Sequence, residues 1–254
     1  MSRFVKQLRH LASRLTANAA HRTTLEVPIT SRDEAARWTQ WGGYGEALRL
    51  LLPTDALVMQ GGIGFGDPSH PFVAAIREGC VALETYYSRV QPKSLVEWHQ
   101  VDPADPRETA VPAWEVPWIE RVDRLPPPGE CGLVAEHGVS FYGPVTREKL
   151  SLEYRRLTSL AESIAANGYR PDRHGDIDGY FMFDEDSQFR FFVRGGKHRA
   201  AALAATGTAM VPVAFKQDWP RHVALRDSPD WPLVRDGQLS ESVARQIFLK
   251  YFDS

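Results

Sequence analysis

The sequence predicts an α+β protein, and three observations lead to this class. The chain has 254 residues, of which 43% are hydrophobic and 24% are charged, an ordinary composition for a globular protein. No apolar run approaches the roughly 18 residues that a membrane-spanning helix needs. In the third quarter the pattern reads helix, strand, strand, glycine turn, helix and strand. This order is typical of a compact α+β unit.

Net charge indicates which partners the protein can bind, and cysteine content indicates the redox state of its compartment. The formal net charge is −2, whereas a dedicated DNA-binding protein usually carries a basic excess that neutralises phosphates. We therefore expect no stable DNA binding. Cys80 and Cys131 are far apart and lack the spacing of a metal site, and two cysteines do not make a disulfide framework. A reducing, cytoplasmic environment is the expectation.

Residues 1–25 form a segment of their own. The first acidic residue is Glu26, and four apolar residues recur at helical spacing, so the segment is a candidate basic amphipathic helix. Such a helix can contact an anionic membrane surface or dock on a protein, including the body of this chain. An acid-free, arginine-bearing start also resembles a mitochondrial transit peptide. The basic residues are Arg3, Lys6, Arg9, Arg14 and Arg22, and the apolar ones are Phe4, Leu8, Leu11 and Leu15.

Residues 26–128 are predicted to form a mixed, mostly helical extension. Residues 33–51 suggest a helix broken at Gly42-Gly43, residues 56–59 a short buried strand, and residues 72–87 a second helix. The region that follows is rich in proline, which removes backbone donors and makes it irregular. Because Trp114 and Trp118 lie within it, we expect it to pack on the body. We place the boundary near Pro128.

Residues 129–218 are the most regular part. Thr146 can cap a long helix that ends at Asn167-Gly168. Strands are predicted at residues 177–183 and 189–193, with a polar turn between them. A helix over 200–205 and a strand over 211–215 follow. In the tail, residues 219–254, a helix over 241–252 is expected to close over the core.

The strongest chemical signal is the turn Gly195-Gly196-Lys197-His198-Arg199, which joins a strand to a helix. The first N–H groups of a helix lack internal partners and carry the positive end of the helix dipole. Glycines let an anion approach the backbone, Arg199 can grip phosphate through its planar fork, and Lys197 adds a point charge. His198 can donate or relay a proton. This pattern predicts a phosphate cradle, or alternatively a tight turn bearing three solvated cations.

The segment GGKHRAAALAATGTAMVPV, residues 195–213, resembles the signature of the ParB/sulfiredoxin-like superfamily. The resemblance extends over residues 141–215 and leaves out the N-terminal half. It implies a ParB/sulfiredoxin-like unit that binds nucleotide phosphates at the glycine turn. Known members include sulfiredoxins, CTP-binding chromosome-partitioning proteins, and small-molecule kinases of the free-serine type.

The residues of the turn separate these branches. Sulfiredoxins carry a reactive cysteine where this chain has Lys197, and no other cysteine lies nearby. Partitioning proteins place Glu-Arg-Arg after the glycine and continue into a helix-turn-helix domain, for which little chain remains after Phe215. The pattern Gly196-x-His198-Arg199 is most similar to the kinase branch, although that branch often has Asp at the position of Gly195.

A kinase of this kind would need a base for the acceptor hydroxyl besides the clamp formed by Gly195, Gly196, Lys197, His198 and Arg199. Glu136 is the candidate base, since it lies in a polar break just before the unit, with His137 orienting substrate or phosphate. Both residues can equally be surface loop residues. His198 is the second candidate for proton transfer.

Three further groups of residues are candidates. Asp176 and Asp178 point to one face of a predicted strand, where they could support Mg²⁺ or a ribose, or serve only as turn caps. Asp67 and His70 follow a glycine-rich loop and could reach the cleft as substrate-specificity residues, or be ordinary loop residues. Glu153 and Arg156 are expected on an exposed helix face.

Two functional hypotheses follow. The first is an ATP-dependent kinase that uses Mg²⁺ and phosphorylates a hydroxyl of an amino acid, sugar or polyol. The second is a regulatory module that binds ATP or CTP without turnover and changes its affinity for a partner.

Overall fold

The computed structural model of the chain describes residues 24–40, 48–120, 133–216 and 219–253. The predicted basic helix of residues 1–25 and the boundary near Pro128 therefore lie outside the described residues, apart from Thr24 and Leu25. Among the described helices, none is long and apolar enough to span a bilayer.

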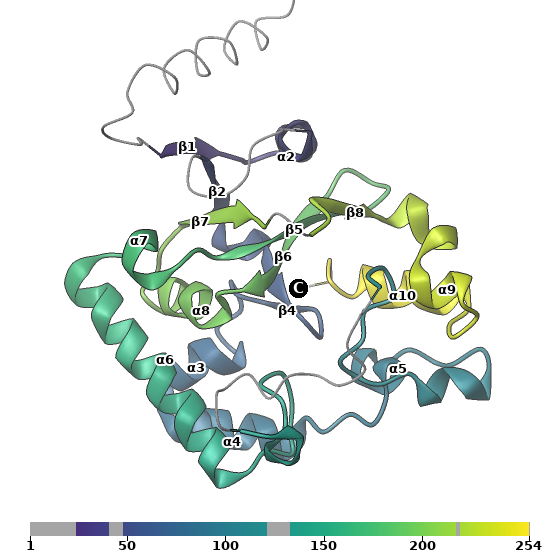
Figure 1. The fold of residues 1–254 in the computed structure, drawn as a ribbon, viewed down its shortest axis with the longest axis horizontal. Coiled ribbons are helices and arrows are strands. Elements are labelled where there is room, and N and C mark those ends of the chain that lie inside the picture. Colours follow the sequence, from purple (N-terminus) through teal and green to yellow (C-terminus); the bar gives the residue numbers. More distant parts are fainter. Residues whose placement is uncertain (1–23, 41–47, 121–132, 217–218, 254) are drawn as a thin grey trace, which may run out of the picture.

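A mixed sheet runs through the middle of the fold (Figure 1). Its order is β1-β2-β7-β5-β6-β3-β4, and β8 pairs with β5 beyond the end of β7. Neighbours β2 and β7, β5 and β6, and β3 and β4 are antiparallel, whereas the other pairs are parallel. The strands are β1 Leu25–Pro28, β2 Leu48–Pro53, β3 Leu57–Met59, β4 Ile63–Gly64, β5 Asp178–Phe183, β6 Phe189–Gly195, β7 Met210–Phe215 and β8 His222–Ala224.

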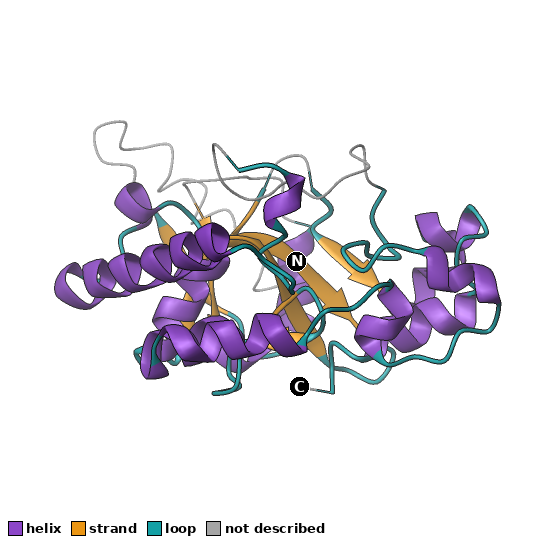
Figure 2. Cartoon of the chain, turned by 90° about the horizontal axis from the view of Figure 1, so that it is seen from below, coloured by secondary structure: helices purple, strands orange, loops and turns teal. Residues whose placement is uncertain are grey.

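Helices cover both faces of this sheet (Figure 2). One core contains buried side chains of α3, α6 and α8, and the other contains those of α5 and α10. The α-helices are α2 Arg32–Thr39, α3 Pro71–Glu78, α4 Cys80–Arg89, α5 Leu95–His99, α6 Arg147–Asn167, α7 Pro171–His174, α8 Lys197–Ala205, α9 Pro232–Arg235 and α10 Glu241–Leu249.

The central strand β5 shows how the sequence builds two cores. Phe181 and Phe183 lie in the core beneath α6 and α8, whereas Tyr180 and Met182 lie in the core beneath α10. Successive side chains of a strand point to opposite faces, so a continuous apolar run is needed where both faces are covered. The tail helix α10 closes the second face with Val243, Ala244, Ile247 and Phe248.

The predicted mixture of helices and strands is confirmed, and so are the elements expected after residue 140. Thr146 caps α6 by accepting from the N–H of Lys149, and Gly168 ends that helix with φ 72°. The polar turn between β5 and β6 is held by Asp184, whose Oδ1 accepts three backbone N–H groups.

The N-terminal half differs from its prediction in two respects. The helix predicted over residues 72–87 is two helices, α3 and α4, with Gly79 between them at φ 99°. A broken helical region was expected over residues 33–51, but the helix ends at Thr39 and Leu48–Pro53 is the strand β2. Leu48, Leu50 and Leu52 alternate with half-buried residues, and this period of two favours a strand over a helix. This half therefore contributes four strands to the sheet rather than a mostly helical extension.

Candidate functional site

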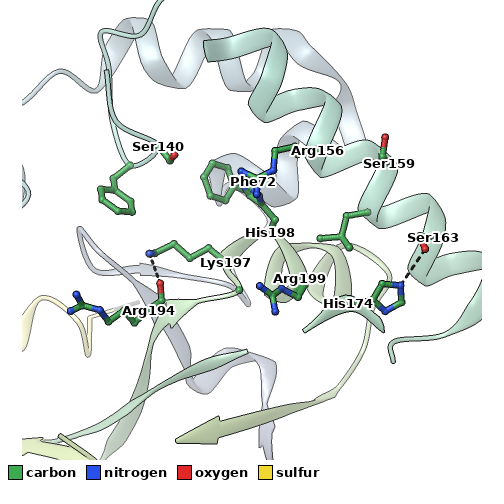
Figure 3. A pocket seen from close by; sticks show the side chains of 13 residues that line it. Phe72, Ser140, Arg156, Ser159, Ser163, His174, Arg194, Lys197, His198 and Arg199 are labelled. Carbon is green, nitrogen blue, oxygen red and sulfur yellow. Dashed lines mark hydrogen bonds between the residues drawn. The ribbon is translucent and has the colours of Figure 1, made fainter. Parts of the chain in front are cut away.

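A cavity of about 590 Å³ lies between α6 and the N-terminus of α8 (Figure 3). Its walls come from α3, from the loop before α6, from α6 and α7, and from the β6–α8 turn. The lining residues are Phe72, Ser140, Phe141, Arg156, Ser159, Leu160, Ser163, His174, Arg194, Gly196, Lys197, His198 and Arg199.

The glycine turn forms the floor of the cavity. Strand β6 ends at Gly195, Gly196 adopts a left-handed conformation with φ 82°, and α8 begins at Lys197. Within the described residues no side chain caps the start of α8, where Lys197, His198 and Arg199 line the cavity. The first N–H groups of this helix are therefore without a capping partner. This is the geometry that the sequence predicted for an anion cradle.

Gly196 is required for this turn, and Gly196→Ala is expected to destabilise the protein by about 1–2 kcal/mol. A Cβ at this position would lie 3.0 Å from the carbonyl oxygen of Asp176 and 3.0 Å from Cα of Ile177, in addition to the cost of the positive φ. Urea unfolding of the variant measures the loss. Gly207→Ala is the matched control, because Gly207 also has a positive φ but an added Cβ there would meet no described atom within 4 Å.

Behind the turn, a buried carboxylate orients His198. His198 Nε2 lies 2.7 Å from Oε2 of Glu153, which is fully buried on α6. The other oxygen of Glu153 lies 2.5 Å from Nζ of Lys149 and accepts the hydroxyl of Ser140. Lys149 is also fully buried and donates to Ser140. Glu153 therefore holds the imidazole from behind, while His198 lines the cavity.

The partners of Glu153 keep it ionised. Burial acts to raise the pKa of Glu153, but the hydrogen bond and charge of His198, with hydrogen bonds from Lys149 and Ser140, outweigh it and lower the pKa to about 2. The charged carboxylate of Glu153 therefore lies beside the imidazole of His198. The expectation that Glu153 lies on an exposed helix face was wrong.

The cavity is strongly basic. Arg156, Arg194, Lys197 and Arg199 line it, and no carboxylate is among the described residues of its lining. Burial and the charge of Arg199 lower the pKa of Arg156, so the two guanidiniums repel one another. A bound anion would relieve this repulsion. The basic wall therefore favours a multiply charged ligand.

Asp176 and Asp178, the predicted Mg²⁺ ligands, lie outside the lining of the cavity. The carboxylate of Asp176 is paired with Arg49, whose Nε and Nη2 lie 3.0 and 2.9 Å from Oδ1. The carboxylate of Asp178 lies against Gly195, where an added Cβ would be 2.6 Å from either oxygen. Within the described residues, no group of three or more acidic, histidine or cysteine side chains could hold a metal ion. The backbone of Asp176 serves the site instead, because its carbonyl accepts from Arg199.

The structure does not bring Glu136 or His137 to the cavity. Both lie on the short 3-10 helix Ala135–His137, and Glu136 is exposed to solvent. His137 Nδ1 accepts the backbone N–H of Val134, so the ring caps its own turn. The carboxylate that reaches the glycine turn is that of Glu153, from the second turn of α6.

Asp67 and His70 have structural roles. The exposed carboxylate of Asp67 accepts the backbone N–H of Ser69. His70 is fully buried and caps α3, with Nδ1 accepting from the N–H of Phe72. Burial lowers the pKa of His70 to about 3, so the ring is neutral and packs on Phe65 with centroids 4.3 Å apart. Neither residue lines the cavity, so the predicted contact with substrate is not present.

At the far end of the cavity, α6 and α7 present short polar side chains. His174 Nδ1 accepts the backbone N–H of Arg170, so its Nε2 carries the hydrogen that points to Oγ of Ser163, 3.2 Å away. Ser159 lies one turn earlier on α6 and also lines the cavity. These groups can hydrogen-bond a hydroxylated ligand such as a ribose.

Comparison with known proteins adds no assignment: no protein-family model matches this sequence, and no curated protein is significantly similar to it. The arguments about function therefore rest on the residues of this cavity.

Proposed function

We propose that this protein is an ATP-dependent kinase that transfers the γ-phosphoryl group to a hydroxyl of a small metabolite. The observation that carries the proposal is that His198, held by Glu153, lines the same cavity as the open N-terminus of α8. A phosphate cradle and a group able to accept a proton thus share one space. The resemblance of the glycine turn to the ParB/sulfiredoxin-like kinases agrees with this proposal.

The nucleotide would lie along α6. Its phosphates would meet the N–H groups at the start of α8, with Arg156 and Arg199 contributing charge. Its ribose would reach Ser159, Ser163 and His174. In this arrangement the acceptor enters from the side of Ser140 and Phe141.

His198 would act as the base. In the proposed mechanism the hydrogen of His198 is on Nε2, the nitrogen that lies 2.7 Å from Glu153, and the lone pair of Nδ1 is left for the acceptor hydroxyl. As Nδ1 takes the proton, the hydroxyl oxygen bonds to the γ-phosphorus, and the bond from that phosphorus to the β–γ bridging oxygen breaks. ADP leaves with the electron pair, and Glu153 stabilises the imidazolium.

A specific observation favours the second candidate, a module that binds nucleotide without turnover. Phosphoryl transfer usually uses Mg²⁺ held partly by carboxylates, and among the described residues no carboxylate lines the cavity. The two candidates differ in a single result. The kinase consumes ATP in the presence of an acceptor, whereas the module binds ATP or CTP and leaves it intact.

Calorimetry with ATP, ADP and CTP, each with and without Mg²⁺, tests the nucleotide site. Arg156→Ala is expected to weaken binding about tenfold or more, because a hydrogen bond to a charged group contributes about 1.5–3 kcal/mol. Arg155→Ala is the matched control, since Arg155 is exposed, adjacent in sequence, and outside the cavity lining. If no nucleotide binds the wild type, both candidates fail.

A further inference from the structure

One end of the cavity carries positive charge that the nucleotide does not account for. Figure 3 shows Lys197 and Arg194 on one side of His198, and Arg199 and His174 on the other. Ser140 lies on the first side as well, and Phe141 lines the cavity next to Lys197. We call the group formed by Ser140, Phe141, Arg194 and Lys197 the Lys197 end.

The ammonium group of Lys197 contacts neutral groups. It donates to the carbonyl oxygen of Arg194, 2.8 Å away, and lies 4.6 Å from the ring centroid of Phe141. These two contacts use at most two of the three N–H donors that an ammonium has, so at least one remains for a ligand. Arg194 stacks over Trp219 and adds a second cation nearby.

Two features of its surroundings disfavour the positive charge of Lys197. Burial, followed by the charge of Arg194, lowers the pKa of Lys197 to about 8. Asp178 and Glu153 act in the opposite direction, but each has less effect on this pKa than Arg194 has. Glu153 is already bound by Lys149, Ser140 and His198. An anion placed at the Lys197 end would favour the charged form of Lys197 and so offset part of this cost.

The chemistry of the same end also admits a hydroxyl group. Oγ of Ser140 accepts from Lys149 and donates to Glu153, so its hydrogen is committed and one lone pair remains. His198 also lines the cavity, and in the proposed mechanism its Nδ1 accepts the proton of a hydroxyl. The Lys197 end thus combines positive charge with acceptors for a hydroxyl.

We propose that the Lys197 end binds an acidic group of the acceptor, a carboxylate or a phosphate, while the nucleotide phosphates lie on the Arg199 side of His198. This inference rests on the proposed kinase function and narrows the acceptor to a hydroxylated metabolite that carries an acid group. In this arrangement Lys197 binds the acceptor, whereas the sequence predicted that it would bind the nucleotide phosphates.

The test titrates a second anion into the full-length protein saturated with adenylyl imidodiphosphate, an ATP analogue that is not hydrolysed. Inorganic phosphate and malonate are the two probes, and the tighter one identifies the class of acid group. We expect one anion per chain, bound at least tenfold more weakly by Lys197→Met and bound normally by Lys197→Arg. Lys93→Met is the control, because Lys93 is exposed and outside the cavity lining.

The wild type supplies a second measurement that needs no variant. A lysine with a pKa of about 8 is charged below that pH and neutral above it, so affinity for either probe is expected to fall from pH 7 to pH 9. Malonate is fully ionised across this range, which makes it the cleaner of the two probes.

Three results would overturn the inference. In the first, neither anion binds the saturated wild type. In the second, both anions bind Lys197→Met as tightly as they bind the wild type. In the third, Lys197→Met weakens binding of the ATP analogue by the same factor as it weakens anion binding, which would assign Lys197 to the γ-phosphate. Absence of analogue binding to the wild type is a different failure. That result would contradict the kinase proposal. If the same protein still bound an anion in a way that depends on Lys197, the anion site would remain supported without the kinase function.

Discussion

Replacement of Lys149 by methionine is expected to destabilise the fold by about 3–5 kcal/mol, the largest effect on stability that we foresee for a single substitution. Lys149 and Glu153 are fully buried one turn apart on α6, with 2.5 Å between Nζ and Oε1. Methionine fills a similar volume but leaves the carboxylate buried without this cation. The loss of stability comes from the buried negative charge of Glu153, which remains after the substitution.

The double variant Lys149→Met/Glu153→Leu distinguishes this explanation from a loss of packing. If the uncompensated carboxylate is the cause, removing it should recover most of the loss, since a buried ion pair is often no more stable than apolar residues of similar volume. Urea unfolding of the two single variants and the double variant gives the coupling free energy between Lys149 and Glu153. A loss below about 1 kcal/mol for Lys149→Met would contradict the prediction.

The burial of Lys149 and Glu153 could have been predicted from their spacing along α6. Lys149 and Glu153 precede Leu157, Ala161 and Ile164 at spacings of four, four, four and three, so they continue the apolar stripe of α6. A charged pair on the buried stripe of an amphipathic helix indicates a paired internal site. The expectation of a solvated face for Glu153 overlooked that alignment.

The elements that could be predicted are those with strong local signals. The αL glycine, the Thr146 cap and the aromatic strands depend on neighbours within a few residues, and the structure places them as expected. The proposed catalytic pair and the partner of Asp176 depend instead on contacts between residues far apart in the chain. Glu153 and His198 are 45 positions apart, and the partner of Asp176 is Arg49, so no local pattern determines either pair.

The candidate base Glu136 was chosen for its nearness in sequence to the unit, and the structure places it outside the cavity lining. Glu136 lies in a polar break before the unit, and polar loops often carry functional residues. Whether such a residue reaches a site depends on the path of the chain between elements. Here the loop returns to the cavity at Ser140 and Phe141, whereas the exposed Glu136 does not line it.

His198→Gln is expected to lower kcat by about 10²–10⁴-fold, the contribution typical of a general base, with little change in the affinity for ATP. Glutamine keeps a polar group at the start of α8 but cannot take the hydroxyl proton. The measurement is ATP consumption with the acid-bearing hydroxylated compound that the wild type phosphorylates fastest, together with calorimetry of ATP binding.

Glu153→Gln separates orientation from structural support. If Glu153 acts through His198, the substitution lowers kcat and leaves KM for ATP unchanged, and the double variant His198→Gln/Glu153→Gln is no slower than His198→Gln alone, because residues that act as a unit are not additive. Glu162→Gln, an exposed change on the same helix, is the control. Full activity of Glu153→Gln, or losses that multiply in the double variant, would instead mean that the carboxylate only pairs with Lys149. The contact with His198 would then contribute to folding, and the base would have to be sought elsewhere in the cavity.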